Sequence, residues 1–319
     1  MCNTINGTKT ACFNITVFAE MVMKQLKDLL GDGYSISVSE NRKNNGITPV
    51  GLSISSNSKR PDAGVIIYLE GYLESYNEGD MDIRDICENI IKVFHENMRD
   101  FDFDAGSITS FDKVKDQLRL KLVNSELNKE QLYMQPHRSF RDLAIVYYLP
   151  LQVNGYAASM TVSLSLMELW GVDEDELYNT AIKNVKHKSD YCIIGIADLM
   201  KDTASKMGVN VEDGFCAPPP DMEMYVATNA SRELASNIIL NNNMLKEFSD
   251  SIHGRDFYIL PSSIHDLIFI PATDWADVRR FSEMVKDVND NELDKEEILS
   301  YSVYRYNRDR NSVIVECYG

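Results

Sequence analysis

Apolar residues recur every three or four positions in several stretches of the chain, and this spacing predicts helices with one buried face. The first such helix, 17–30, has Thr16 as its expected N-cap and ends at Gly31-Asp-Gly33. Longer patterns of the same kind predict helices at 83–98, 173–186, 244–252 and 275–288. Shorter ones predict helical segments at 111–117, 125–134, 166–170 and 234–239.

Other stretches alternate apolar and polar residues, which is the pattern of a strand with one buried face. Two pairs of them flank the polar loops 40–46 and 307–311 and so predict β-hairpins. Hairpins require antiparallel pairing, so we expect a mixed α+β fold of largely antiparallel sheets with amphipathic helices packed on them. The strands are expected at 34–39, 50–54, 65–69, 118–123, 142–149, 156–163, 222–227, 303–306 and 312–315.

The stretch 257–272 is the most informative part of the chain. An apolar run, the polar turn Pro261-Ser-Ser-Ile-His-Asp266 and a second apolar run follow one another between two helical patterns. This order predicts two buried strands that carry a small group of polar side chains at their connection.

At 319 residues the chain is long enough for one large domain or two ordinary ones, and the sequence leaves both open. We expect an N-terminal α+β region, 1–135, and an acidic C-terminal α+β region, 136–319. The clearest connection lies near 217–221, because consecutive prolines exclude both a helix and a central strand.

The formal net charge of −17 is unevenly distributed. Residues 1–150 hold 17 Lys and Arg against 21 Asp and Glu, a balance of −4, and residues 151–319 hold the remaining 15 against 28, a balance of −13. Such a field repels phosphate backbones, so we expect no direct binding of nucleic acid. An acidic surface that mimics DNA stays open as an alternative.

Signals for a membrane, a metal or a cofactor are weak. No apolar run reaches the roughly 18–20 residues that span a bilayer, and no basic segment leads into an apolar one at the N-terminus, so we expect a cytoplasmic protein. The six cysteines are scattered without metal-ligand spacing, which favours reduced, packed thiols and no metal. No glycine-rich phosphate loop is present, so no cofactor is expected.

Ser263, His265 and Asp266 form the sharpest candidate for catalysis. In an extended segment Ser263 and His265 point to the same face, and a nucleophile needs a base within hydrogen-bond reach. Catalytic triads, however, are usually assembled from distant segments, and no G-x-S-x-G elbow is present. We therefore prefer the interpretation that Ser262 or Ser263 caps the next turn while His265 satisfies a buried carbonyl.

Asn124, Glu126 and Asn128 alternate along the chain, and His137 and Asp142 follow downstream. Together they could form a cluster of amides and carboxylates that binds a polar ligand or a cation, although no calcium-binding loop is present. Helix capping by Ser125 and Asn128 explains this stretch more simply, and we prefer it.

Thr228 and Asn229 follow a predicted strand. In open sheets, ligands bind at the carboxyl ends of strands, so both residues are candidates for ligand contact. A role as a helix N-cap is at least as compatible with their residue types.

Several blocks of residues carry a resemblance to a known family. The most specific is Tyr258-Ile-Leu-Pro-Ser-Ser-Ile-His265, and the others are Lys43–Gly46, Ile67–Leu69, Asn124–Asn128, Pro136-His137, Asp142–Ala144, Leu169–Gly171 and Thr228-Asn229. In these blocks the chain resembles a family of uncharacterised proteins of Gram-positive gut bacteria, catalogued as a domain of unknown function. The resemblance implies one full-length unit and brings no established activity.

The charge asymmetry and the lack of a catalytic signature predict a non-enzymatic protein-binding or accessory module, in which the acidic C-terminal half engages a protein partner. The alternative from another class is a hydrolase or transferase. Its site would gather Ser263 and His265 with the polar residues Asn124, Glu126, His137 or Asp142.

Overall fold

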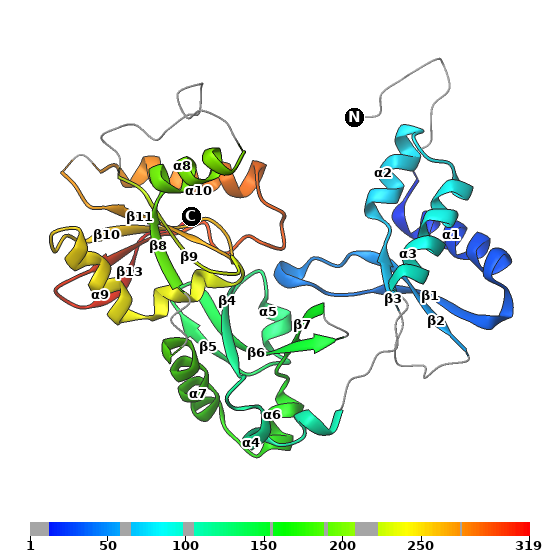
Figure 1. Cartoon of the computed structure of the whole chain (residues 1–319), viewed down its shortest axis with the longest axis horizontal. Coiled ribbons are helices and arrows are strands. Elements are labelled where there is room, and N and C mark those ends of the chain that lie inside the picture. Colours follow the sequence, from blue (N-terminus) through cyan, green and yellow to red (C-terminus); the bar gives the residue numbers. More distant parts are fainter. Residues whose placement is uncertain are drawn as a thin grey trace. The chain divides into compact units, whose positions relative to one another are not determined.

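The chain forms two compact units in a computed structural model (Figure 1). The structure describes residues 13–57, 65–97, 105–153, 156–187, 191–207, 223–274 and 276–319. Unit 1 comprises 1–43, 47–103 and 152–156, and unit 2 comprises 44–46, 104–151 and 157–319. The position expected for the domain boundary, between 135 and 136, lies inside unit 2. The expected connection at 217–221 lies outside the described residues.

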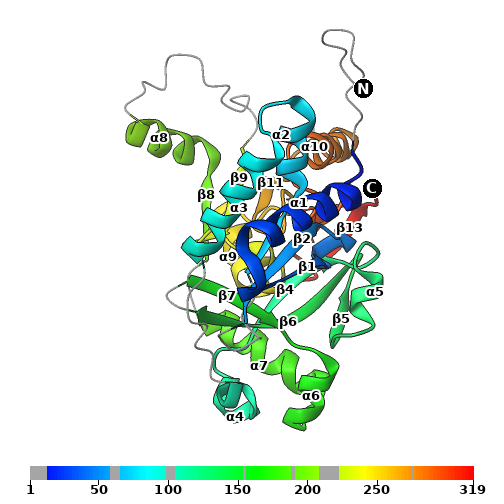
Figure 2. The same cartoon turned by 90° about the vertical axis from the view of Figure 1, so that its right-hand side faces the viewer.

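Unit 1 is a three-stranded antiparallel sheet with helices on one face (Figure 2). Its elements are α1 (Ile15–Leu30), β1 (Tyr34–Glu40), β2 (Val50–Ser56), β3 (Val65–Tyr68), α2 (Glu70–Glu78) and α3 (Ile83–Asn97). Phe18 and Leu26 of α1 and Ile90 of α3 pack with Leu52 of β2 in one core. The true N-cap of α1 is Asn14, whose side chain accepts the backbone N–H of Thr16, so the expected cap at Thr16 is wrong by two residues.

One sheet of unit 2 is built around β6 and has the strand order β4-β6-β5, with β7 also paired to β6. Its strands are β4 (Arg119–Asn124), β5 (His137–Phe140), β6 (Leu143–Val153) and β7 (Tyr156–Thr161). The helices of this part are α4 (Phe111–Val114), α5 (Lys129–Leu132), α6 (Leu164–Trp170) and α7 (Glu174–His187). Leu120 pairs with Tyr147, and Leu122 with Ile145, so one face of the sheet enters the main core of unit 2.

The other sheet of unit 2 has six antiparallel strands in the order β13-β12-β10-β11-β9-β8. They are β8 (Tyr191–Gly195), β9 (Tyr225–Asn229), β10 (Phe257–Pro261), β11 (Leu267–Pro271), β12 (Val303–Asn307) and β13 (Ser312–Cys317). The helices of this part are α8 (Ile196–Met207), the 3-10 helix η4 (Ala235–Leu240), α9 (Asn242–Ser251) and α10 (Val278–Asn291).

The hairpin β10–β11 lies in the middle of this sheet and is buried on both faces (Figure 1). Tyr258 packs with Phe281 of α10 on one face. Phe257 and Phe269 pack with Phe248 of α9 on the other face, in the core that also takes the apolar face of β4 and β6. The predictions of two buried strands in 257–272 and of a mixed, mostly antiparallel α+β fold are confirmed.

Candidate functional site

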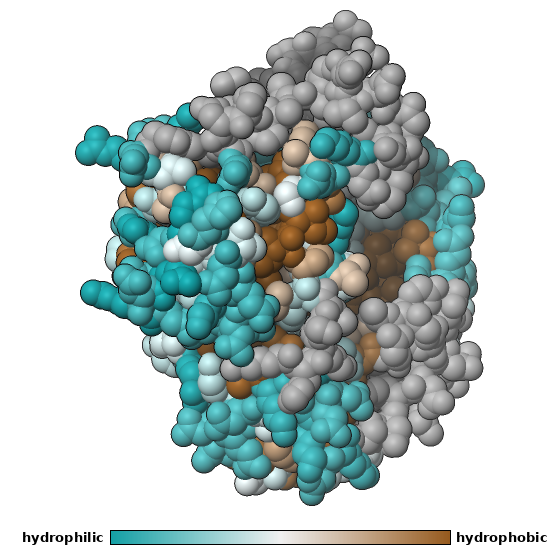
Figure 3. Space-filling model, turned by 60° about the vertical axis from the view of Figure 1, so that its left-hand side comes forward, coloured by the Kyte–Doolittle hydropathy of each residue, from teal (hydrophilic) through white to brown (hydrophobic). Residues whose placement is uncertain are grey.

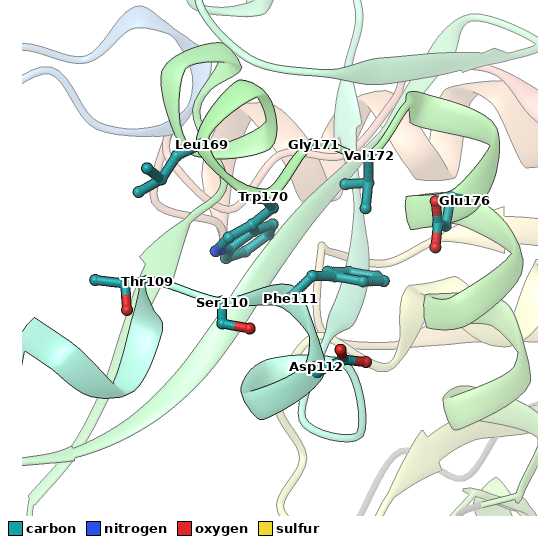
Figure 4. A pocket seen from close by; sticks show the side chains of 9 residues that line it. All are labelled: Thr109, Ser110, Phe111, Asp112, Leu169, Trp170, Gly171, Val172 and Glu176. Atoms are coloured by element: carbon teal, nitrogen blue, oxygen red, sulfur yellow. The ribbon is translucent and has the colours of Figure 1, made fainter.

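A pocket opens in unit 2 between the segment that leads into α4 and the connection from α6 to α7 (Figure 4). Its volume of about 340 Å³ is at the lower end of the range of about 300–1,000 Å³ found for ligand sites. It is lined by Thr109, Ser110, Phe111, Asp112, Leu169, Trp170, Gly171, Val172 and Glu176. Two aromatic rings, an exposed leucine and two carboxylates therefore border one opening.

Trp170 and Phe111 form an aromatic wall of the pocket. Trp170 is the last residue of α6, and Gly171 ends this helix with a left-handed φ of 68°, which glycine adopts without steric cost. The indole N–H of Trp170 donates to the carbonyl oxygen of Ile108 at 2.7 Å. The two rings pack 5.7 Å apart, centroid to centroid, and both are nearly buried, so the wall is rigid.

Asp112 and Glu176 bring negative charge to the pocket. Asp112 accepts a hydrogen bond from Lys115 Nζ at 2.7 Å, and this contact lowers the pKa of Asp112 and raises that of Lys115. Within the described residues the Glu176 carboxylate accepts no hydrogen bond, although Lys115 lies near enough to feel its charge. Glu176 is thus the carboxylate of the pocket with the greater capacity to bind another cation.

Two of the acidic residues that begin α7, Glu174 and Asp175, bind Arg138. Arg138 Nη2 donates to Glu174 at 2.6 Å and also to Asp175, while its guanidinium carbon lies 4.1 Å from the ring centroid of Tyr178. Tyr147 donates its hydroxyl to the same Glu174, and burial, followed by this hydrogen bond, raises the pKa of Tyr147. We call these five residues the Arg138 clasp. Because the clasp occupies Glu174 and Asp175, it holds the first turn of α7 in place.

The candidate catalytic residues are engaged with backbone groups of unit 2. Ser263 Oγ accepts the N–H groups of His265 at 2.9 Å and Asp266 at 3.3 Å, which is a serine turn. His265 Nδ1 accepts the N–H of Leu234 at 3.2 Å, so the proton of the neutral ring is on Nε2, which lies 3.6 Å from Glu297 Oε1. Ser263 thus caps the turn as predicted, whereas His265 accepts a backbone N–H instead of donating to the buried carbonyl that was expected.

Asp142 accepts hydrogen bonds from three hydroxyl groups that lie far away in the sequence. Ser300 donates at 2.6 Å, Ser302 at 3.0 Å and Tyr304 at 2.7 Å. Asp142 itself occupies the two-residue turn between β5 and β6, after Arg141 with its left-handed φ of 60°. Burial, followed by the charge of Asp142, raises the pKa of Tyr304 well above 10.0. We call these three hydroxyls and the carboxylate the Asp142 network.

Two of the other predicted ligand-binding residues also have structural partners. Asn124 Oδ1 accepts the N–H groups of Glu126 at 3.1 Å and Leu127 at 3.0 Å. Asn128 exchanges two hydrogen bonds with Asn45, which is part of unit 2, at 2.8 and 2.9 Å. The side-chain nitrogen of Asn124 reaches the carbonyl oxygen of Leu299 at 3.2 Å, one residue before the Asp142 network.

Glu126 and His137 lie apart from this group. The Glu126 side chain is 82% exposed and pairs loosely with Lys129, 3.4 Å away. His137 is exposed on β5, with Nδ1 3.1 Å from the carbonyl oxygen of Gln135. The structure thus brings Asn124 and Asp142 to one segment, 298–302, and Asn128 is linked to it through Asn45, whose side chain donates to the carbonyl oxygen of Ile298 at 2.7 Å. The other two residues of the expected cluster are left at the surface.

Thr228 and Asn229 differ in their surroundings. Asn229 Oδ1 accepts from the Ser231 hydroxyl at 3.0 Å and from the Glu233 N–H at 3.1 Å, so this side chain closes its own turn. Thr228 Oγ1 and Asp266 Oδ1 are buried oxygens without a hydrogen-bond partner among the described residues. Since Leu267 pairs with Ala227, these two residues continue the pairing of β11 and β9 at the strand ends.

The residues that border the pocket were absent from the candidates named by sequence. Leu169 and Trp170 appear there as the end of a short helix and in a block of family resemblance, and the acidic run 173–176 as a helix start. The available signal was a tryptophan at a helix end, separated by two residues from four consecutive acidic residues. Phe111 and Asp112 carried no such signal, because they reach the pocket from a segment about 60 residues away in the sequence.

Two further searches of the described residues gave negative results. No group of three or more His, Cys, Asp or Glu side chains in them is placed to hold a metal ion. No helix in the described ranges is both long and apolar enough to cross a bilayer.

Comparison with known proteins places the chain in a family. A family model described as a family of unknown function (DUF5688) matches residues 15–308. The chain belongs to this family. The resemblance expected from the sequence blocks is thereby confirmed, and the DUF5688 match includes the pocket, the Arg138 clasp and the Asp142 network. No curated protein and no solved structure matches the chain, so function has to be argued from the site itself.

Proposed function

We propose that this chain is a non-enzymatic binding module in which unit 2 engages a basic surface of a protein partner. The proposal rests on the pocket. It combines a rigid aromatic wall, the 62% exposed Leu169 and two carboxylates, and it contains no nucleophile paired with a base. Aromatic anchors with an apolar neighbour and a charged rim are the anatomy of a protein interface.

Exposed apolar side chains near α6 support the proposal. Tyr133 and Met134 are each 72% exposed, and the carbonyl oxygen of Met134 accepts the N–H of Leu164 at the start of α6. Leu164 is itself exposed, and Leu169 lies at the other end of the same helix. Apolar groups gathered beside one helix favour burial against a partner.

The charge of the chain favours a basic partner. Residues 151–319 carry a balance of −13, which accelerates encounter with a cationic surface and repels nucleic acid. Figure 3 shows hydrophilic side chains over much of the face that it draws. The described cysteines Cys87, Cys192 and Cys317 are free thiols, as is usual in a reducing cytoplasm, where we propose that the partner is met.

The hydrogen bonds of the alternative site also favour a binding role. Ser263 Oγ already accepts two backbone N–H groups, and His265 Nδ1 accepts a third, so the neutral ring carries its proton on Nε2. A serine hydrolase needs a free imidazole lone pair beside its nucleophile, and in this arrangement neither ring nitrogen of His265 offers one. We therefore expect Ser263→Ala to weaken the turn between β10 and β11 and to leave partner capture unchanged.

Affinity capture at two salt concentrations tests the proposal. The tagged full chain is incubated with lysate of its host at low and at high salt, and bound proteins are quantified by mass spectrometry. We expect a stoichiometric basic partner that is released at high salt, because screening weakens attraction between exposed charges. Duplex DNA added as a competitor separates the alternatives, since only a DNA mimic would lose its partner to it.

Two leucine variants provide the matched comparison. Leu169→Ser removes the exposed leucine of the pocket, and Leu29→Ser removes one of similar exposure on α1 of unit 1. Capture of the partner should fall with Leu169→Ser and persist with Leu29→Ser. Recovery of the chain alone at both salt concentrations, or equal capture by both variants, would contradict the proposal.

A further inference from the structure

The pocket has the chemistry of a site for a cationic side chain. Asp112 and Glu176 both border it, and because Lys115 pairs with Asp112, the Glu176 carboxylate remains to attract a cation. Its wall consists of Trp170 and Phe111, whose π faces attract cations. The hydroxyl of Ser110 makes no capping hydrogen bond to α4, so an acceptor is also at hand for an N–H group.

The first turn of α7 already binds one arginine within unit 2. In the Arg138 clasp the guanidinium group meets the carboxylate of Glu174 with two nitrogens and stacks over the ring of Tyr178. The pocket contains the same two kinds of group, a carboxylate and aromatic rings. Glu176 supplies a carboxylate without a hydrogen bond in the described residues, and Trp170 and Phe111 supply the rings.

We propose that this pocket takes one arginine side chain from a basic segment of the partner, an inference that rests on the proposed function. A planar guanidinium group can lie against the aromatic wall and donate two hydrogen bonds to one carboxylate, whereas an ammonium group offers only a point charge. Lys115 forms an ion pair with Asp112, so Glu176 is the main hydrogen-bond acceptor for the arginine. Asp112 adds to the negative electrostatic potential of the pocket.

Tryptophan fluorescence of the full chain tests the proposal directly. The chain has two tryptophans, and the substitution Trp275→Phe leaves Trp170 as the only one. Three capped pentapeptides that differ only at their central residue, which is arginine, lysine or citrulline, are titrated into this variant. We expect a saturable change in emission with the arginine peptide, and binding weaker by about tenfold with citrulline, which keeps the shape and loses the charge.

The variant Glu176→Gln should weaken binding of the arginine peptide by about tenfold, because it removes the charged acceptor. Glu283→Gln on α10 is the matched control, since Glu283 is an exposed carboxylate outside the pocket. Circular dichroism checks that both variants fold. Equal binding of the three peptides, an unchanged affinity in Glu176→Gln, or no change of emission at millimolar arginine peptide would each overturn the assignment.

Capture of the partner by the Glu176→Gln variant distinguishes a failure of the arginine assignment from a failure of the proposed binding function. If Glu176→Gln still captures the partner at the level of the unmodified chain, the binding function stands and the arginine assignment fails. If the arginine peptide binds as expected while no partner is captured, the pocket chemistry stands and the proposed function fails.

Discussion

Asp142 shows at the scale of a single residue how polar side chains stabilise unit 2. Its carboxylate accepts hydrogen bonds from Ser300, Ser302 and Tyr304 and so ties the turn between β5 and β6 to the strand β12. In Asp142→Asn an amide N–H₂ would replace one carboxylate oxygen and face hydroxyl donors. We expect a loss of about 1–3 kcal/mol in the free energy of unfolding, measured by urea denaturation.

Asp309→Asn is the control for this prediction, because Asp309 is an exposed aspartate in the β12–β13 turn. Surface substitutions of this kind usually change stability by less than about 0.5 kcal/mol. Equal stability of the two variants would show that the Asp142 network contributes little to the fold.

Tyr304 gives the network a dependence on alkaline pH. Burial raises its pKa well above 10.0, the ordinary value at which the tyrosine of the unfolded chain ionises. The stabilising contribution is therefore complete below pH 10 and is lost as pH rises toward the folded pKa. Urea midpoints measured from about pH 8 to about pH 11 should fall less steeply in Tyr304→Phe. Parallel curves for the two proteins would contradict this assignment.

Residue type predicted local roles better than distant ones. The capping preference of serine anticipated the turn at Ser263, because that interaction lies within three residues. The caps expected of Ser125 and Asn128 are wrong, because the Ser125 hydroxyl donates to the carbonyl oxygen of Asp142 and the Asn128 side chain makes no capping hydrogen bond to α5. The partners of Asp142 lie about 160 residues away in the sequence, and no local preference of Asp142 points to them. The pocket depends on such distant contacts throughout.

At the scale of elements, the end of α6 decides whether the pocket forms. Gly171 holds a left-handed φ of 68°, and a Cβ there would meet open space, so only the backbone resists a larger residue. Gly171→Ala should cost about 1–2 kcal/mol of unfolding free energy. Gly71→Ala, in the helix α2 and also facing open space, should instead stabilise by about 0.5–1 kcal/mol. Effects of the same sign in urea denaturation would contradict this account.

The periodicity of apolar residues predicted the helices and strands that bury a continuous apolar face. It missed those that do not. α2 was expected as a connection, because none of its residues is fully buried and its pattern is weak. The strand β5 and the pair β8–α8 were also missed, and β8 is only half-buried along its length. A helical segment was expected at 234–239, and residues Ala235–Leu240 form the 3-10 helix η4 after Leu234, which turns left-handed where its N–H donates to His265.

At the scale of the whole molecule, the sequence predicted the fold class and the family but not the division into units. The segments 44–46 and 152–156 each belong to a unit different from that of their sequence neighbours, and such exchanges follow from tertiary contacts rather than from composition. The excess of acidic residues in 151–319 was visible in the sequence. The sequence did not show that acidic side chains line the same pocket as Trp170 and Phe111.

Hydrogen exchange of the chain, alone and with its captured partner, tests the binding account most directly. The account predicts slower amide exchange in 108–112 and 164–176, the segments that border the pocket, when the partner is added. Exchange in unit 1 serves as the internal reference. Unchanged exchange in both segments, with slowing confined to the turn Ser262–Asp266, would contradict the account and favour a site at His265.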